Sequence, residues 1–194
     1  MSLDHAEVAA PPQTTVSPQT TAPEGTPERT PGPFGGHAPA PPSPAAALHI
    51  LSGATAVLLA LVAIGTLVHQ AVLIPPLAAS AALVHSAPTQ PLAQPRSVIG
   101  GHLLSAGTGY GVLAAFGHSP WAAAAAAALA LGAMMLTRTP HSPACATAVI
   151  VVLQGPDPLR FLAALLGATV LLVLAGYAAS RARRKAPVYP AYWW

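Results

Sequence analysis

The hydrophobic residues of this chain fall into long runs, separated by short breaks that contain proline. A helix needs about 20 apolar residues to cross a bilayer core of about 30 Å. Four runs approach that length, and three of them begin with a Ser or Asp cap followed by Pro. Ser97 is the predicted cap of the remaining run. The predicted full spans are 45–68, 98–116, 120–137 and 159–179.

Two shorter apolar runs, 71–87 and 138–154, lie between pairs of full spans and contain proline near their starts. In the second run, the apolar residues from Pro143 to Leu153 would extend only about 16 Å as a helix. That is about half of a membrane crossing, so we expect two half-helices. The pattern predicts an all-α polytopic membrane protein with four long transmembrane helices and two short half-helices.

The two short runs also resemble each other. Pro, Ala, Ser or Thr, Ala and Val recur in both at positions 67 residues apart, so that Pro76 matches Pro143 and Ser80 matches Thr147. An inverted repeat of two long-short-long units explains the match. Chance similarity in an alanine-rich chain is the alternative, and the sequence leaves both open.

The arginines give a prediction of topology. If every element crosses the membrane, the two units, about 45–117 and 119–180, have opposite orientations. Arg96, Arg138 and the basic run 181–185 then share one side, which the positive-inside rule makes cytoplasmic. Re-entrant half-helices in a four-span protein are the alternative. We expect both termini in the cytoplasm and the protein in the cell membrane.

Composition supports a membrane location and removes several classes of function. Hydrophobic residues make up 53% of the chain and charged residues 7%, against about 25% in soluble domains. The basic run beside the last helix indicates topology or lipid contact, so we expect no nucleic-acid partner. The predicted spans contain no acidic residue, no Ser/His/Asp set and no metal-ligand pair. We therefore expect no enzyme, no metal and no cofactor.

The two ends of the chain differ from its apolar middle, 45–180. Residues 1–44 are rich in proline and lack apolar periodicity, so we expect a disordered spacer. Residues 181–194 form a basic and aromatic tail. Its tyrosines and tryptophans, Tyr189 among them, are expected in the lipid headgroup region.

The starts of the half-helices, at Pro76 and Pro143, are the candidate binding site. Half-helices that begin in mid-membrane present free N–H groups and the positive end of a dipole, which suit an anion. Ser80 and Thr147 lie one turn further along. Each hydroxyl either lines the site or bonds back to the preceding turn, and the sequence leaves both open.

Three basic or ionisable residues complete the candidate site. His102 lies one turn inside its span, and His141 leads directly into the second half-helix. Ionisable groups at membrane depth usually face a cavity or a partner. Arg96 lies on the same predicted side as Arg138. For these residues, setting topology or touching headgroups is the alternative role.

Two long motifs give the membrane part a family likeness. They read Gln90-Pro-Leu-Ala-Gln-Pro-Arg-Ser-Val-Ile-Gly-Gly-His102 and Arg138-Thr-Pro-His-Ser-Pro-Ala-Cys-Ala-Thr147. Together with Pro75-Pro76 they resemble the HPP family of integral membrane proteins, over about 45–180. Ser142 stands where the name-giving His-Pro-Pro has its first proline. The resemblance implies four spans and transport, with nitrite indicated by plant and cyanobacterial members.

The resemblance to the family implies no established catalytic residues. We select Arg96, His102, His141 and Pro143 as candidate substrate-binding residues because they lie in the matching motifs. We predict an integral membrane permease for a small inorganic anion, such as nitrite, either passive or proton-coupled. The expected partners are the lipid bilayer and the anion, and a homo-oligomer is left open. The alternative is a non-transporting scaffold that assembles through the glycine-rich face 100–111.

Overall fold

The computed structural model describes residues 40–69, 72–182 and 187–193. The predicted disordered spacer, 1–44, lies outside these residues except at its end, and so does most of the basic run 181–185. The chain divides into two units, 1–41 and 42–194, and all of the described helices belong to the second unit.

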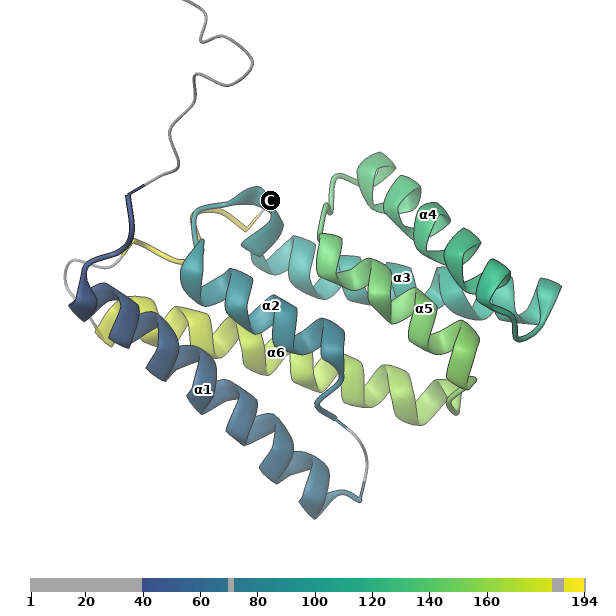
Figure 1. Cartoon of the computed structure of the whole chain (residues 1–194), viewed down its shortest axis with the longest axis horizontal. Coiled ribbons are helices and arrows are strands. Elements are labelled where there is room, and N and C mark those ends of the chain that lie inside the picture. The colour runs from purple at the N-terminus through teal and green to yellow at the C-terminus, as the bar shows by residue number, and fades with distance from the viewer. Residues whose placement is uncertain (1–39, 70–71, 183–186, 194) are drawn as a thin grey trace, which may run out of the picture. The chain divides into compact units, whose positions relative to one another are not determined.

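The described residues form six α-helices and two short 3-10 turns, with no strand among them, which confirms the all-α prediction (Figure 1). The long helices are α1 (Pro44–Leu67), α3 (Pro95–Phe116), α4 (Pro120–Leu136) and α6 (Pro158–Ala182). The short ones are α2 (Pro75–Ser86) and α5 (Cys145–Gln154). The 3-10 turns, η1 (Pro91–Ala93) and η2 (Ser142–Ala144), precede α3 and α5.

Proline and short polar caps mark most of the helix starts, as the sequence predicts. The amide of Ala46 donates to the Ser43 hydroxyl (3.3 Å), and that of Ala122 donates to Ser119 (3.0 Å). The predicted cap at Ser97 is wrong, because α3 begins two residues earlier, at Pro95. Proline lacks a backbone N–H and has a helical φ, so it is well suited to the first position.

Three helices, α1, α3 and α6, are long and apolar enough to cross a bilayer. The fourth predicted span, α4, has 17 residues. At 1.5 Å per residue such a helix is about 26 Å long, shorter than a bilayer core. Large side chains such as Leu67, Leu136 and Leu159 are at least 80% exposed, as expected for a surface that meets lipid.

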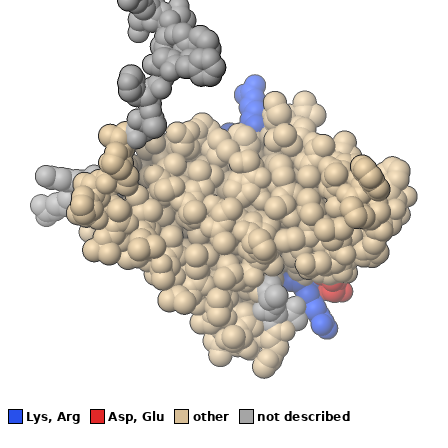
Figure 2. Space-filling model, viewed as in Figure 1, with Lys and Arg blue, Asp and Glu red and all other residues tan. Residues whose placement is uncertain are grey.

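Charged side chains are scarce and peripheral in the part of the chain that the structure describes. Figure 2 shows them at two opposite edges of the visible face, with an uncharged surface between them. The charged residues described are Arg96, Arg138, Asp157, Arg160 and Arg181. An uncharged surface of this kind suits a hydrocarbon environment, in which an unpaired charge is costly.

The helices form two groups of three (Figure 1). In the first group α1 and α2 pack on α6, and in the second group α4 and α5 pack on α3. The helices α3 and α6 contact each other between the groups. Small residues bring the second group together, because Ala122, Ala126 and Ala130 pack at one-turn intervals against Ala148 and Val152.

Candidate functional site

Four polar side chains meet where the two short helices begin. Ser80 comes from α2, His102 from α3, His141 from the segment before η2, and Thr147 from α5. Each is fully buried, with 0% of its surface exposed. We call these four residues the central cluster. Buried polar groups require hydrogen-bond partners. The four side chains find them in one another and in the backbone carbonyls of Pro76 and Leu92.

Ser80 is the centre of the hydrogen-bond network. Its Oγ donates to the carbonyl oxygen of Pro76 at 2.8 Å, one turn back along α2. The same Oγ lies 2.9 Å from Nε2 of His102 and 2.8 Å from Nε2 of His141. Both roles that the sequence left open for this hydroxyl are therefore present, since it bonds back to its helix and also faces the two histidines.

The outer nitrogens of the two rings also have partners. Nδ1 of His102 lies 2.8 Å from Oγ1 of Thr147, and Nδ1 of His141 lies 2.7 Å from the carbonyl oxygen of Leu92. The ring centroids are 4.9 Å apart, with planes tilted by 60°. All four ring nitrogens are thus hydrogen-bonded, which fixes the orientation of both imidazoles.

Gly101 makes room for His141. A Cβ added to Gly101 would lie 2.8 Å from Cβ of His141 and 3.3 Å from the carbonyl oxygen of Thr139. Any side chain at this position would therefore displace the segment that holds His141. The glycine beside His102 in the Gly-Gly-His motif lets α3 approach that segment closely.

The loop that provides the Leu92 carbonyl is held by Gln94 within the loop and by Tyr189, which is distant in sequence. Nε2 of Gln94 donates to the carbonyls of Pro88 and Gln90, both at 2.9 Å. The Tyr189 hydroxyl donates to the carbonyl of Ala93 at 2.9 Å. Tyr189 is 1% exposed, so its predicted place in the headgroup region is wrong, and burial raises the pKa of its phenol.

The remaining predicted site residues lie around the cluster. Pro76 contributes its carbonyl to Ser80, whereas Pro143 lies half-buried in η2 and the α-helix itself begins at Cys145. The predicted start of this half-helix at Pro143 is therefore wrong for the α-helix, because Pro143 lies in a 3-10 turn that precedes it. Arg96 is half-buried, and its Nη2 donates to the carbonyl of Arg138, away from the cluster's hydrogen bonds.

Sequence reasoning missed the Leu92 carbonyl, Gly101 and Gln94 as supports of the site. A backbone carbonyl carries no sequence signal. Gly101 is one of several glycines in the same helix, and the sequence does not show which of them contacts a neighbouring segment. Gln94 carried only a weak signal, because Thr89 and Gln90 are also polar and nothing in the sequence marks Gln94 as the buried one.

The cluster lacks any negative charge. Asp157 is the one acidic residue among those described, and its Oδ1 accepts from the amide of Arg160 (2.9 Å) at the start of α6. No group of three His, Cys, Asp or Glu side chains that would hold a metal ion occurs in the described ranges. The donors present, two imidazoles and two hydroxyls, suit proton transfer and the binding of an anion.

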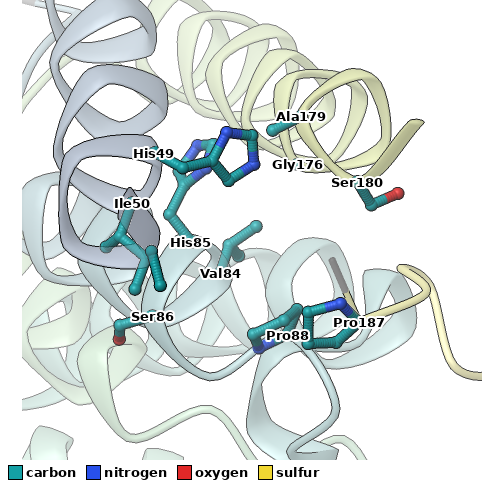
Figure 3. Close-up of a pocket in the computed structure, with 11 residues that line it drawn as sticks. His49, Ile50, Val84, His85, Ser86, Pro88, Gly176, Ala179, Ser180 and Pro187 are labelled. Carbon is teal, nitrogen blue, oxygen red and sulfur yellow. The ribbon is translucent and has the colours of Figure 1, made fainter. Parts of the chain in front are cut away.

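A second pair of histidines lies outside the cluster. His49 on α1 and His85 on α2 line an open pocket of about 240 Å³, together with Ser180 of α6 (Figure 3). Nε2 of His85 is buried and has no hydrogen-bond partner among the described residues. A Cβ added to Gly53 would lie 2.7 Å from Nδ1 of His85, so a glycine makes room for a histidine here too.

Comparison with known proteins gives relatives that are named only as membrane proteins. Two proteins of Dictyostelium discoideum, each named a transmembrane protein, are 37% identical over 132 residues and 35% identical over 126 residues. The matches cover 63% and 60% of this chain but 46% and 40% of the relatives, so the chain spans less than half of their length. No solved structure matches.

The family comparison is more extensive. The transmembrane region of the HPP family matches residues 39–189, which include all six helices, the central cluster and Tyr189. The apolar helices and the scarcity of charge agree with a membrane location. The chain is an integral membrane protein that belongs to the HPP family.

Proposed function

We propose that this protein is a permease for a small inorganic anion, with nitrite the first substrate to test, and that it is not an enzyme. The observation that carries the proposal is the central cluster. It places two imidazoles and two hydroxyls, all fully buried, among the apolar helices of a membrane protein. Polar groups at membrane depth are expensive and usually mark the path of a substrate or ion.

The position of the cluster at the starts of α2 and α5 favours an anion. The first turn of a helix is the positive end of the helix dipole. In α2 the first two residues are prolines without an N–H, and the amides of Leu77 and Ala78 bond the carbonyl of Ile74, so the dipole is what this helix start offers an anion. Ser80 lies in the second turn of α2, and Thr147 lies in the first turn of α5. Among the described residues, no carboxylate lies near the cluster. A bound anion would therefore meet no negative charge that repels it.

An inverted repeat would provide the two-sided access that a permease needs, and the packing supports one. Gly109 of α3 lies against α5, where an added Cβ would be 2.9 Å from Val151. Gly176 of α6 lies against α2, where an added Cβ would clash with Val84. Both the two glycines and the two valines are 67 positions apart, the same spacing that relates Ser80 to Thr147.

The buried faces of the short helices follow the same spacing. The pairs of buried residues are Leu77 and Ala144, Ser80 and Thr147, Ala81 and Ala148, and Val84 and Val151. We therefore propose two inverted units with six crossings, both termini in the cytoplasm and the protein in the cell membrane. Transport would then involve movement of one helix group against the other around the cluster.

The described conformation is closed, because all four cluster side chains are inaccessible to solvent. An anion would reach the cluster when the first group moves relative to the second. Such an opening separates Ser80 of α2 from His102 of α3 and from His141 of the segment before η2. The hydrogen-bond donors of the cluster then become accessible. A closed cluster of this kind is what an occluded state requires.

The test is uptake of nitrite, nitrate and chloride into proteoliposomes that contain the purified full chain. We expect saturable nitrite uptake above protein-free liposomes, with a large loss in His141→Ala. His118→Ala serves as a matched control, because Nδ1 of His118 bonds the carbonyl of Val152 outside the cluster. The absence of flux for every anion from folded protein would contradict the proposal and favour a scaffold role.

A further inference from the structure

The hydrogen bonds of the central cluster can be counted proton by proton. A serine hydroxyl has one hydrogen to donate and two lone pairs to accept. Ser80 has three partners, the Pro76 carbonyl and Nε2 of each histidine. The carbonyl only accepts, so the hydroxyl hydrogen goes to Pro76. All three contacts are hydrogen bonds at once only when both Nε2 atoms carry a hydrogen.

His102 meets this condition as a neutral ring. Its Nε2–H donates to Ser80, and its Nδ1 accepts the hydroxyl hydrogen of Thr147 at 2.8 Å. A hydroxyl serves as donor or acceptor. Thr147 can therefore donate to Nδ1 of a neutral His102, and this contact does not require a charged ring. One neutral tautomer of His102 is therefore sufficient.

His141 cannot meet the condition as a neutral ring. Its Nδ1 faces the carbonyl oxygen of Leu92, which only accepts, so the ring hydrogen of neutral His141 lies on Nδ1. Its Nε2 then competes with Pro76 for the single hydrogen of Ser80. A proton added to Nε2 removes this competition. Nε2 of His141 is thus the position at which an added proton makes all three contacts of Ser80 hydrogen bonds at once.

A proton on His141 would lack a counter-charge within the described part of the protein. Among the elements that pack around this residue, α3 contributes His102 and Arg96, α4 is followed by Arg138, and α5 contributes Cys145. On α2 the titratable group is His85, which lines the separate pocket. None of these is a carboxylic acid. An isolated imidazolium at membrane depth is unstable without an anion beside it.

We infer that the cluster binds one proton and one monovalent anion together, the proton on Nε2 of His141, so that permeation is electroneutral. This inference rests on the proposed anion permease. On one side a proton from water forms the N–H bond as the anion binds, and on the other side both are released. Each cycle moves one positive and one negative charge, and His141 returns to its neutral form.

The test is the response of nitrite flux to voltage. Proteoliposomes with potassium gradients and valinomycin set the membrane potential, and a trapped pH-sensitive dye reports the lumen. We expect the initial rate of uptake to change less than about 2-fold with potential, with one proton entering per nitrite. Protein-free liposomes correct for nitrous acid that crosses the lipid unaided. Nitrate provides an anion whose acid form is negligible near neutral pH.

The possible outcomes distinguish a failure of this inference from a failure of the proposed anion permease. Protein-dependent flux that rises with an inside-positive potential, without lumen acidification, would overturn the inference and leave an anion permease. No protein-dependent flux at all would overturn both. Ser80→Ala removes the acceptor for the added proton, so we expect about a 10-fold loss of proton-coupled flux.

Two further variants keep the inference falsifiable. Ser105→Ala is the matched control for Ser80→Ala, because Ser105 is a fully buried hydroxyl of α3 that donates to Sδ of Met134 at 3.8 Å and not to the cluster. His141→Gln retains a donor but cannot take up a proton. Its residual flux should depend on potential and lose its dependence on the pH gradient. Residual flux that stays electroneutral would contradict the assignment to His141.

Discussion

Two histidine pairs in this protein show how differently buried imidazoles can be used. In the central pair, His102 and His141, every ring nitrogen has a hydrogen-bond partner and both rings are completely buried. In the pocket pair, His49 and His85, Nε2 of His85 has none among the described residues, and the rings border an open pocket. Burial alone therefore does not define a site.

The difference lies in the partners. The central pair faces acceptors and donors from α2, α5 and the loop at Leu92, which together fix the tautomer of each ring. The pocket pair faces mostly apolar side chains. Only the central pair has a hydrogen-bond network whose proton count can change in a defined way. The comparison predicts that anion flux depends on the central pair and not on the pocket pair.

The largest contrast is expected between His141→Gln and His85→Gln. The first variant removes an imidazole bonded to Ser80 and Leu92, and we expect a loss of nitrite flux of about 100-fold. The second should change flux less than about 2-fold, because it breaks no bond in the cluster. Uptake assays on both variants, at equal protein per liposome, measure the contrast. Equal losses would show that the two pairs do not differ in role.

Two glycines offer the next test, because each makes room for one histidine. Gly101→Ala forces Cβ against Cβ of His141, and we expect it to lower the free energy of unfolding by about 1–3 kcal/mol and to abolish flux. Gly53→Ala meets the His85 ring, which can rotate, so we expect a smaller loss of stability and preserved flux. Thermal unfolding in detergent and uptake measure the two effects. Preserved flux in Gly101→Ala would argue against a fixed position for His141.

Threonine substitutions extend the comparison to one hydroxyl in each of the two helix groups, Thr147 of α5 and Thr169 of α6. Thr147→Val removes the partner of Nδ1 of His102, and we expect about a 10-fold loss of flux. Thr169→Val is the control, because Thr169 is equally buried but its hydroxyl bonds only the carbonyl of Leu166, within its own helix (3.0 Å). Uptake measurements that give the same loss for both would place the effect in general packing.

The smallest effect is expected from the support of the Leu92 loop. Tyr189→Phe removes the bond to the Ala93 carbonyl, which should lower the free energy of unfolding by about 1 kcal/mol and reduce flux slightly. Tyr192→Phe should have no measurable effect, because Tyr192 is 40% exposed. Chemical unfolding in detergent compares the two variants. A loss of stability from Tyr192→Phe alone would reverse the role assigned to the C-terminal segment.

Much of the fold followed from local rules of sequence. Prolines and Ser or Asp caps marked helix starts because these residues satisfy or lack the N–H groups that a helix leaves unpaired. The polar members of the cluster were also predicted as candidates, since Ser80, His102 and Thr147 each interrupt an apolar run and His141 leads directly into one. What joins them could not be found, because the shared centre at Ser80 depends on how α2, α3 and α5 pack.

Other features depended on contacts that leave no local trace. Tyr189 is buried because its ring packs against Val84, Val98 and Val173, and the carbonyl of Ala93 accepts its hydroxyl. From sequence, aromatic residues near a basic run usually indicate an interface. The start of α5 at Cys145 depends on the 3-10 turn at Ser142–Ala144. The bounds of α4 were predicted to within one residue, because Ser119-Pro120 marks its start and Thr137-Arg138 interrupts the apolar run directly after Leu136.

The most direct test of the central claim is a nitrite titration of the full chain in lipid, with ¹⁵N-labelled histidine observed by solid-state NMR and His141→Gln used for assignment. We predict that the resonances of His102 and His141 shift, that Nε2 of His141 gains a hydrogen, and that the resonances of His49 and His85 stay unchanged. Shifts confined to His49 and His85, or no shift at saturating nitrite, would contradict the assignment of anion binding to the central cluster.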